Sequence, residues 1–255
     1  MTAPLAWSAE ECAINGFPPL RQVVLGDWLL RFSFGVRRTA NSATPLREPS
    51  GDFAEVVEAA ETLYRGQSLP TIIRLPSMID PAIDRELAAR GYTAEGESCI
   101  IAGPLEPIIA SAAPYGDATA AVELSATPSE QWLAAMARVQ GQSPEFHAVY
   151  RKIVRSVALP AAFAMLAVEG EAVALAYSII HRGLLCFESV VTDAAHRRRG
   201  HSRRVLAALA LWGRDKGAMG STLQVEASNT AGRTLYHAIG MTTELHRYHY
   251  RRQPA

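Results

Sequence analysis

The chain has 255 residues, a length that suits one large domain or two small ones, and we favour two. Hydrophobic residues make up 49% of it and charged residues 20%, which excludes a disordered chain and leaves enough apolar side chains for a buried core. Basic and acidic residues each number 25, so no overall charge favours binding to nucleic acid or to an anionic membrane.

The sequence also lacks the patterns that mark membrane insertion, export or metal binding. No stretch offers the ~20 apolar residues of a membrane helix, and the first residues do not resemble a signal peptide. We therefore expect a soluble, cytoplasmic protein. Cys12, Cys99 and Cys186 are far apart and odd in number, which fits neither a disulfide framework nor a zinc site. Reduced core thiols and no bound metal are expected.

The first part of the chain alternates predicted strands and helices. Apolar side chains from Trp28 to Phe34 alternate with other residues, which predicts a strand and then a turn. Asp52 and Asp80 each precede a run with helical spacing, as N-cap residues do. The result is a small α/β unit with strand, helix, strand, helix and strand at residues 26–45, 52–66, 69–75, 80–91 and 92–101.

Prolines and small residues then interrupt the pattern between residues 103 and 119. We place a linker at residues 106–119, between an N-terminal domain at residues 1–105 and a C-terminal domain at residues 120–255. The second domain is predicted to contain a strand at 122–124, helices at 128–140 and 144–157, an antiparallel meander at 162–168, 172–180 and 184–192, a helix at 203–216, a strand at 223–227, a helix at 230–239 and a strand at 242–251.

The most informative stretch reads VVTDAAHRRRGHSRRVLAALALWGRDKG, a strand followed by a turn at Gly200 and a helix. Free amides of such a turn and of the helix N-terminus hold a diphosphate without a metal, and glycine permits close approach. The stretch has neither a Walker ending nor a dinucleotide fingerprint, which disfavours nucleoside triphosphates and NAD. Taken alone, it is equally compatible with a solvated basic loop.

The run Arg197-Arg198-Arg199-Gly200-His201-Ser202 resembles the Arg/Gln-x-x-Gly-x-Gly/Ala motif of the GCN5-related N-acetyltransferase (GNAT) family, with Ser at the last position. In that family the motif cradles the pyrophosphate of coenzyme A. The resemblance implies acetyl-CoA as cosubstrate. It also implies that the cradle consists of Arg197, Arg198, Arg199, Gly200, His201, Ser202 and Arg203.

A second signature of the same family, Asn-x-x-Ala-x-x-Leu-Tyr-x-x-x-Gly-Phe, resembles the run from Asn229 to Met241, where Gly232 and Met241 replace Ala and Phe. By this resemblance Asn229 contacts the cofactor arm, and Tyr236 protonates the departing thiolate. The alternative interpretation of Tyr236 is a core aromatic residue on an amphipathic helix. With both signatures in the family's order, we favour the catalytic interpretation.

The resemblance further implies that the strand at 184–192 lines the acetyl group, with backbone groups of Val190, Val191 and Thr192 on the pantetheine arm. Glu188 is in phase with Val190 on this strand and is our candidate general base, although an exposed carboxylate is an equal alternative. Glu226 and His201 are weaker candidates. The implied fold is α+β, with a mixed, mostly antiparallel sheet flanked by helices, preceded by the smaller α/β N-terminal unit.

The N-terminal unit resembles the reduced first half of two-part acetyltransferases, on the residues Trp28, Arg31, Asn41 and Ser42. Such a likeness places these residues at an acceptor pocket between the halves. We favour a plainer interpretation, in which Trp28 belongs to the core and Asn41 and Ser42 form a turn.

Together these observations predict an acetyl-CoA-dependent N-acetyltransferase that moves an acetyl group to the amine of a small molecule or protein by direct attack. The alternative is a non-catalytic acyl-CoA-binding regulatory module, because Ser202, Gly232 and Met241 depart from the family pattern. A nucleic-acid patch at residues 197–204 is disfavoured by the zero net charge and the lack of interleaved aromatic residues. The acceptor amine, the base, and the choice between monomer and homodimer stay open.

Overall fold

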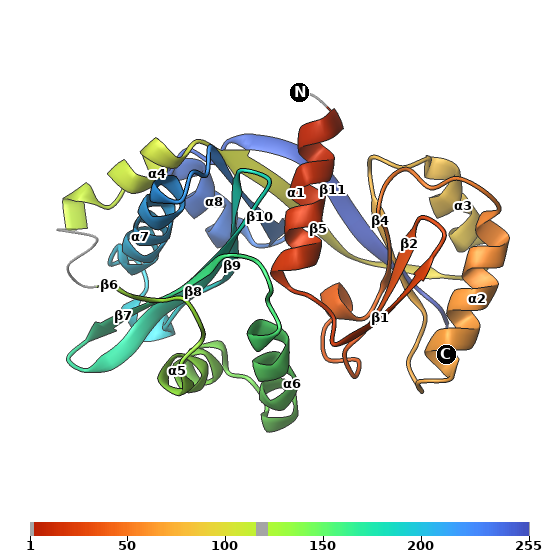
Figure 1. Ribbon diagram of the computed structural model, residues 1–255, viewed down its shortest axis with the longest axis horizontal. Coiled ribbons are helices and arrows are strands. Elements are labelled where there is room, and N and C mark those ends of the chain that lie inside the picture. Colours follow the sequence, from red (N-terminus) through yellow and green to blue (C-terminus); the bar gives the residue numbers. More distant parts are fainter. Residues whose placement is uncertain (1–2, 116–121, 255) are drawn as a thin grey trace.

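A computed structural model describes residues 3–115 and 122–254 of the chain. Its strands form one continuous sheet in the order β1-β2-β3-β4-β11-β5-β10-β9-β8-β7-β6 (Figure 1). The strands are β1 Arg21–Leu25, β2 Trp28–Phe32, β3 Ala43–Pro45, β4 Ile72–Pro76, β5 Thr93–Gly103, β6 Val122–Ser125, β7 Ala161–Val168, β8 Glu171–His181, β9 Leu184–Thr192, β10 Gly220–Glu226 and β11 Thr243–Arg252.

The α-helices are α1 Ala3–Gly16, α2 Phe53–Arg65, α3 Pro81–Ala89, α4 Leu105–Ala110, α5 Glu130–Gln140, α6 Pro144–Arg155, α7 His201–Asp215 and α8 Thr230–Ala238. Short 3-10 turns lie at Arg38–Ala40, Ala113–Tyr115 and Ala194–His196. Within the described part of the chain, no helix combines the length and the apolar composition that a membrane span needs.

The two aspartates that the sequence predicts as helix N-caps are confirmed in that role. Asp52 and Asp80 cap α2 and α3, each accepting a hydrogen bond at 2.8 Å from the amide two residues further on. Gly66 ends α2 as expected. Ser129 and Ser143 cap α5 and α6, each accepting a hydrogen bond from the amide three residues further on. Local side-chain hydrogen bonds therefore set these boundaries.

The two halves of the chain share the sheet, because their strands are interleaved. β11, the last strand of the chain, lies between β4 and β5, and β5 in turn pairs with β10. The predicted meander of β7, β8 and β9 is confirmed. Among the strand pairs, β9 with β10 and β3 with β4 are parallel and the others are antiparallel, so the expected mixed α+β fold is confirmed.

Helices cover both faces of the C-terminal half of this sheet. Along β7, Ala164 and Leu166 pack in a core with α4, α7 and α8, whereas Phe163 and Met165 pack on the opposite face with α5 and α6. Helices α2 and α3 cover β2, β3 and β4 around the buried Trp28. Helix α1 crosses the middle of the molecule, against β8, β9, β10 and β11 (Figure 1).

Several elements were not predicted. Helix α1 buries small residues such as Ala9 and Ala13 rather than a stripe of large ones, so the helical period is weak. β1 is mostly exposed and β3 has three residues, too few for a clear alternation. Both lie within the N-terminal unit that was predicted to begin with a single strand.

The segment expected to be a linker is only partly irregular. It overlaps α4, whose Leu105 and Ile108 are buried beneath α7. Pro104 precedes this helix and Pro107 lies in its first turn, where the missing amide hydrogen has no helical partner in any case. These prolines were therefore misread as loop residues. The rest of the linker extends into residues 116–121, outside the described residues, and the two-domain division stays a prediction.

Candidate active site

The candidate site lies where two parallel strands separate. β9 and β10 pair from Leu184 with Gly220 as far as Phe187 with Leu223, and then part at their carboxyl ends. A cavity of about 750 Å³ lies at this split, lined by β9, β10, α8 and the loop at residues 35–39 of the N-terminal half. Backbone groups of β9 that face the split have no strand partner there, so they are free to bond an extended ligand.

A β-bulge shapes the wall of this split. Tyr177 pairs with Glu188 but Leu175 pairs with Val191, so β9 carries one residue more than β8. Ser189, at a φ of 52°, absorbs the extra length, and its hydroxyl accepts a 2.9 Å hydrogen bond from the buried Tyr150. The bulge therefore interrupts the ladder at the point where Glu188 and Val190 line the cavity.

Glu188 is buried, with 7% of its surface exposed, which rules out the exposed carboxylate considered from the sequence. Burial raises its pKa to about 7, against smaller lowering effects from the Cys186 thiol, Arg37 and Gln224. The thiol donates to Oε1 at 3.7 Å, and the Gln224 amide makes a long contact of 3.5 Å with the same oxygen. A carboxylate with this pKa can accept a proton near neutral pH.

Tyr236 faces the same cavity from α8. Its side chain is 8% exposed, and burial, together with the negative charge of Glu188, raises the pKa of its hydroxyl to about 12. The phenol is therefore protonated at neutral pH and can donate a proton. No hydrogen bond to its hydroxyl is seen among residues 3–115 and 122–254. The structure thus brings together the two residues predicted to be catalytic.

The predicted cradle begins where β9 ends. Gly200 has a φ of 80° and is the N-cap of α7, whose first-turn amides receive no capping side chain among the described residues. The hydroxyls of Ser202 and Thr192 lie 2.6 Å apart and join the helix start to the strand end. Arg197 donates to the Thr192 carbonyl oxygen at 3.4 Å. Strand, turn and helix are thereby held together at the predicted residues.

The surroundings of Gly200 include an aromatic ring that the sequence did not indicate. A Cβ atom at position 200 would overlap the ring of Tyr115, which lies in the 3-10 turn after α4. Glycine is therefore required here both by the positive φ and by this contact. Val191, Thr192 and the residues of the cradle do not line the 750 Å³ cavity, but they continue directly from its β9 wall.

Asn229 lines the cavity and has a structural task as well. Its Oδ1 accepts a 2.9 Å hydrogen bond from the Gly232 amide and caps α8, which leaves the side-chain NH2 group for a ligand. A Cβ atom at position 232 would lie 2.8 Å from this nitrogen, which accounts for the glycine. Of the weaker base candidates, Glu226 is exposed at the cavity edge, and His201 lies in the cradle.

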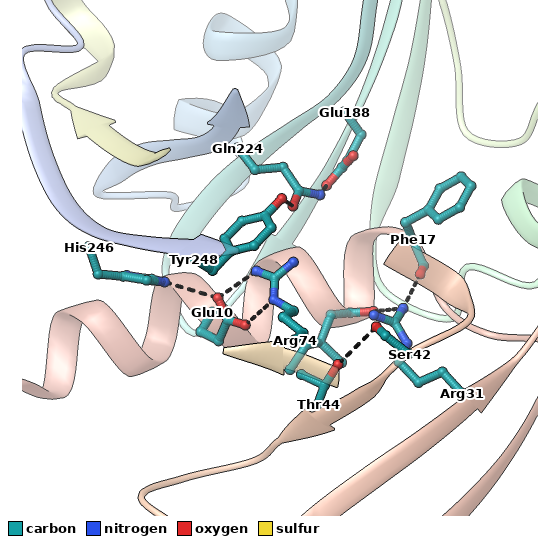
Figure 2. A network of polar contacts seen from close by, with 11 residues as sticks. Glu10, Phe17, Arg31, Ser42, Thr44, Arg74, Glu188, Gln224, His246 and Tyr248 are labelled. Carbon is teal, nitrogen blue, oxygen red and sulfur yellow. Dashed lines mark hydrogen bonds and ion pairs between the residues drawn. The ribbon is translucent and has the colours of Figure 1, made fainter. Parts of the chain in front are cut away.

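Polar residues that the sequence did not single out connect Glu188 to the N-terminal half. Tyr248 of β11 donates a 2.8 Å hydrogen bond to Gln224, the residue beside Glu188. The guanidinium of Arg74 stacks 3.4 Å from the centre of the Tyr248 ring (Figure 2). The one signal in the sequence is a glutamine between the apolar residues Leu223 and Val225, which does not reveal its partner.

The N-terminal residues noted from the sequence have separate roles. Trp28 is a core residue, as we favoured from the sequence. Arg31 lies on β2 and donates hydrogen bonds to the carbonyl oxygens of Ile14 and Phe17, near the end of α1. The Asn41 side chain bonds the backbone of residues 33, 35 and 37 and so holds the loop that reaches the cavity. Ser42 is buried and contacts Thr44.

No cluster of three or more potential metal-binding side chains occurs among the residues that the structure describes. The polar side chains that line the cavity are instead carboxylates, phenols, hydroxyls, amides and guanidinium groups. These groups are suited to proton transfer and to binding of anions.

The parted strands, the bulge and the glycine at the start of α7 define a GNAT fold. A GCN5-related N-acetyltransferase from Kribbella flavida superimposes with a TM-score of 0.70 at 17% identity, covering 100% of this chain and 96% of that one. A tandem GNAT protein from the clavulanic acid biosynthesis pathway gives a TM-score of 0.64 at 13% identity, covering 97% and 88%. At these identities the likeness shows the fold.

The sequence comparisons agree. The family model described as probable histone acetyltransferase Rv0428c C-terminal matches residues 7–251, and the chain therefore belongs to this family of GCN5-related N-acetyltransferases. A relative, the uncharacterized N-acetyltransferase YobR of Bacillus subtilis (strain 168), is 28% identical over 243 residues, which span 95% of this chain and 96% of the relative. The match includes both halves of the chain.

Proposed function

We propose that the protein is an acetyl-CoA-dependent N-acetyltransferase that transfers the acetyl group directly to an amine. The observation that carries this proposal is the shared cavity of Glu188 and Tyr236 at the split between β9 and β10. One group there can accept a proton and the other can donate one, and both lie beside a strand edge that is free to bind a chain. Family membership supports the same reaction class.

The residues fit a coenzyme A thioester. Gly200 and the first-turn amides of α7 would hold the diphosphate, and the positive end of the helix dipole adds to this attraction. Free backbone groups of Val190, Val191 and Thr192 would bond the pantetheine arm along the edge of β9. Asn229 retains an NH2 group toward the cavity. Bound there, the thioester supplies the activated acetyl group.

In this scheme Glu188 removes the proton from the acceptor ammonium, directly or through water, and yields a neutral amine that attacks the thioester carbonyl. Burial of its carboxylate gives the pKa that this step needs near neutral pH. Amides at the β9 bulge would stabilise the negative charge that develops on the carbonyl oxygen. Tyr236 would donate its proton to the departing sulfur, and no covalent bond to the enzyme forms.

Thiol release from acetyl-CoA, measured across a panel of amines, tests this proposal. We expect turnover with at least one amine, a loss of about 10²–10⁴-fold in kcat for Glu188→Gln, and a smaller loss for Tyr236→Phe. Glu171→Gln, an exposed carboxylate at the start of β8 that does not line the cavity, is the control and should retain activity.

Calorimetry with coenzyme A separates the proposal from a non-catalytic acyl-CoA-binding module. Binding without turnover of any amine would favour the module. If coenzyme A does not bind at all, both functions are wrong.

A further inference from the structure

The cavity that contains Glu188 is also lined by three arginines. Arg37 and Arg38 reach the cavity from the loop at residues 35–39, and Arg252 reaches it from the end of β11. Glu188 and Glu226 line the same cavity from β9 and β10. Guanidinium groups from the loop at residues 35–39 and from β11 therefore share one cavity with these carboxyl groups.

The three guanidinium groups are not equally available. Arg38 and Arg252 both pair with Glu95, at 3.6 Å and 3.0 Å. Arg37 makes no ion pair with any carboxylate among residues 3–115 and 122–254, the part of the chain described. Glu95 thus pairs with two of the arginines, whereas the guanidinium of Arg37 has no ion pair among the described residues and acts on Glu188 only through its charge.

Arg37 is also held in place. Its carbonyl oxygen accepts a 2.7 Å hydrogen bond from Asn41, which braces the whole loop. The guanidinium lies 5.0 Å from the centre of the Phe146 ring, and its N–H groups donate no hydrogen bond to another described residue. Because the guanidinium is planar, its N–H edge can bind a carboxylate or phosphate through two parallel hydrogen bonds.

We propose that the acceptor is an amine that also carries an anionic group, a carboxylate or a phosphate. Its amine lies at Glu188 and its anion at Arg37, with the pair of Arg38 and Arg252 adding to the positive field. This inference rests on the proposed transferase function and names the substrate class for it. Polycationic acceptors fit poorly, because their additional charges would face the arginines.

Matched acceptor pairs test the role of charge, with acetyl-CoA kept saturating. One pair is an amino acid and its carboxamide, and the other is phosphoethanolamine and ethanolamine. A lysine-rich peptide serves as the cationic acceptor. The wild-type protein should use the anionic member of at least one pair about tenfold or more better in kcat/KM, and the more strongly preferred pair distinguishes carboxylate from phosphate.

Substitution of Arg37 tests whether this residue causes the preference for anionic acceptors. In Arg37→Gln the KM of the anionic acceptor should rise about 10- to 100-fold, while the neutral acceptor and the KM of acetyl-CoA remain unchanged. Arg37→Lys should recover part of the loss, because the charge remains without the planar fork. Arg47→Gln, an exposed arginine that does not line the cavity, is the control.

Equal or better use of neutral amines by the wild type would overturn the inference and leave the transferase proposal intact. An anionic preference that survives Arg37→Gln, or an equal loss for both members of a pair, would also overturn it. If no amine is acetylated, the proposed function fails and this inference fails with it.

Discussion

Glu188 shows how a single residue changes character when the chain folds. On an isolated strand it is an ordinary carboxylate, but here the end of α1 packs over it so closely that a Cβ atom at Gly16 would lie 3.0 Å from its Oε1. The hydrogen bond from Cys186, the charge of Arg37 and the long contact with Gln224 compensate the desolvation only in part. The carboxylate is therefore kept ready to take up a proton.

The pH dependence of the reaction should report this shift. Glu188 acts as base only when ionised, and its pKa is raised to about 7, so kcat/KM should rise with pH through about 7. The measurement is a pH–rate profile between pH 5 and 9 at fixed acceptor and saturating acetyl-CoA. In Glu188→Gln this rise should be lost, and the remaining pH dependence should come only from the ionisation of the acceptor amine. An unchanged profile in the variant would mean that another group is the base.

At the scale of elements, the split between β9 and β10 and the start of α7 act as one unit. The bulge at Ser189 opens the strand edge, and the bond between Ser202 and Thr192 links that edge to the helix. Ser202 departs from the family pattern, but its hydroxyl is occupied by this link rather than left to disturb the cradle. We therefore expect the predicted cradle to depend on the backbone conformation at Gly200.

Gly200→Ala should accordingly weaken coenzyme A binding as well as stability. Alanine at a φ of 80° costs about 1–2 kcal/mol, and its Cβ would also displace the Tyr115 ring at the helix start. Gly217→Ala is a matched control, because Gly217 has a φ of 87° with open space around it at the other end of α7. Denaturant unfolding measures the stability of the two variants, and calorimetry measures their affinity for coenzyme A.

Both alanine variants should lose stability, but the Gly200 variant should lose more and should alone lose affinity. Equal affinities of the two variants for coenzyme A would show that the turn at Gly200 does not hold the cofactor.

At the scale of the whole molecule, a buried polar cluster connects the two halves. Glu10 of α1 accepts hydrogen bonds from Arg74 at 2.7 and 2.8 Å, and its Oε2 lies 3.0 Å from His246 of β11 (Figure 2). Burial alone would raise the pKa of Glu10, but the charge of Arg74 and these hydrogen bonds lower it to about 2. Through Tyr248 and Gln224 the cluster continues to Glu188.

Removal of one partner from this cluster should be costly. Arg74→Met leaves the Glu10 carboxylate buried without its main partner and should destabilise the protein by about 3–5 kcal/mol. The double variant Glu10→Gln with Arg74→Met should recover much of that loss. Arg90→Met, which breaks an exposed pair with Glu86, is the control and should cost less than about 1 kcal/mol.

The pH dependence of unfolding provides a second measurement of the cluster. Because the folded pKa of Glu10 lies below its ordinary value of 4.5, its stabilisation is present above pH 4.5 and is lost as the pH falls toward 2. The double variant Glu10→Gln with Arg74→Met should lack this pH-dependent contribution to the free energy of unfolding. If Arg74→Met costs no more than Arg90→Met, the cluster does not hold the two halves together.

The sequence by itself determined the elements whose signals are local. The caps at Asp52 and Asp80, the meander of β7 to β9, and the turn at Gly200 all depend on neighbouring residues, so a pattern of a few positions was sufficient. The family resemblance and the phase of Glu188 on its strand likewise predicted one site for Glu188 and Tyr236, and both residues line the cavity. Helix α1 was not predicted, because its buried alanines give little helical periodicity in the sequence.

Only the tertiary structure decided which residues meet across the chain. The insertion of β11 between β4 and β5 brings Tyr248 to Gln224, and the loop braced by Asn41 brings Arg37 to the cavity of Glu188. These contacts join residues from distant parts of the chain, and no local period encodes them. The raised pKa of Glu188 and the arginines of its cavity have one physical reason: interleaved strands bury a carboxylate from one half of the chain against side chains of the other.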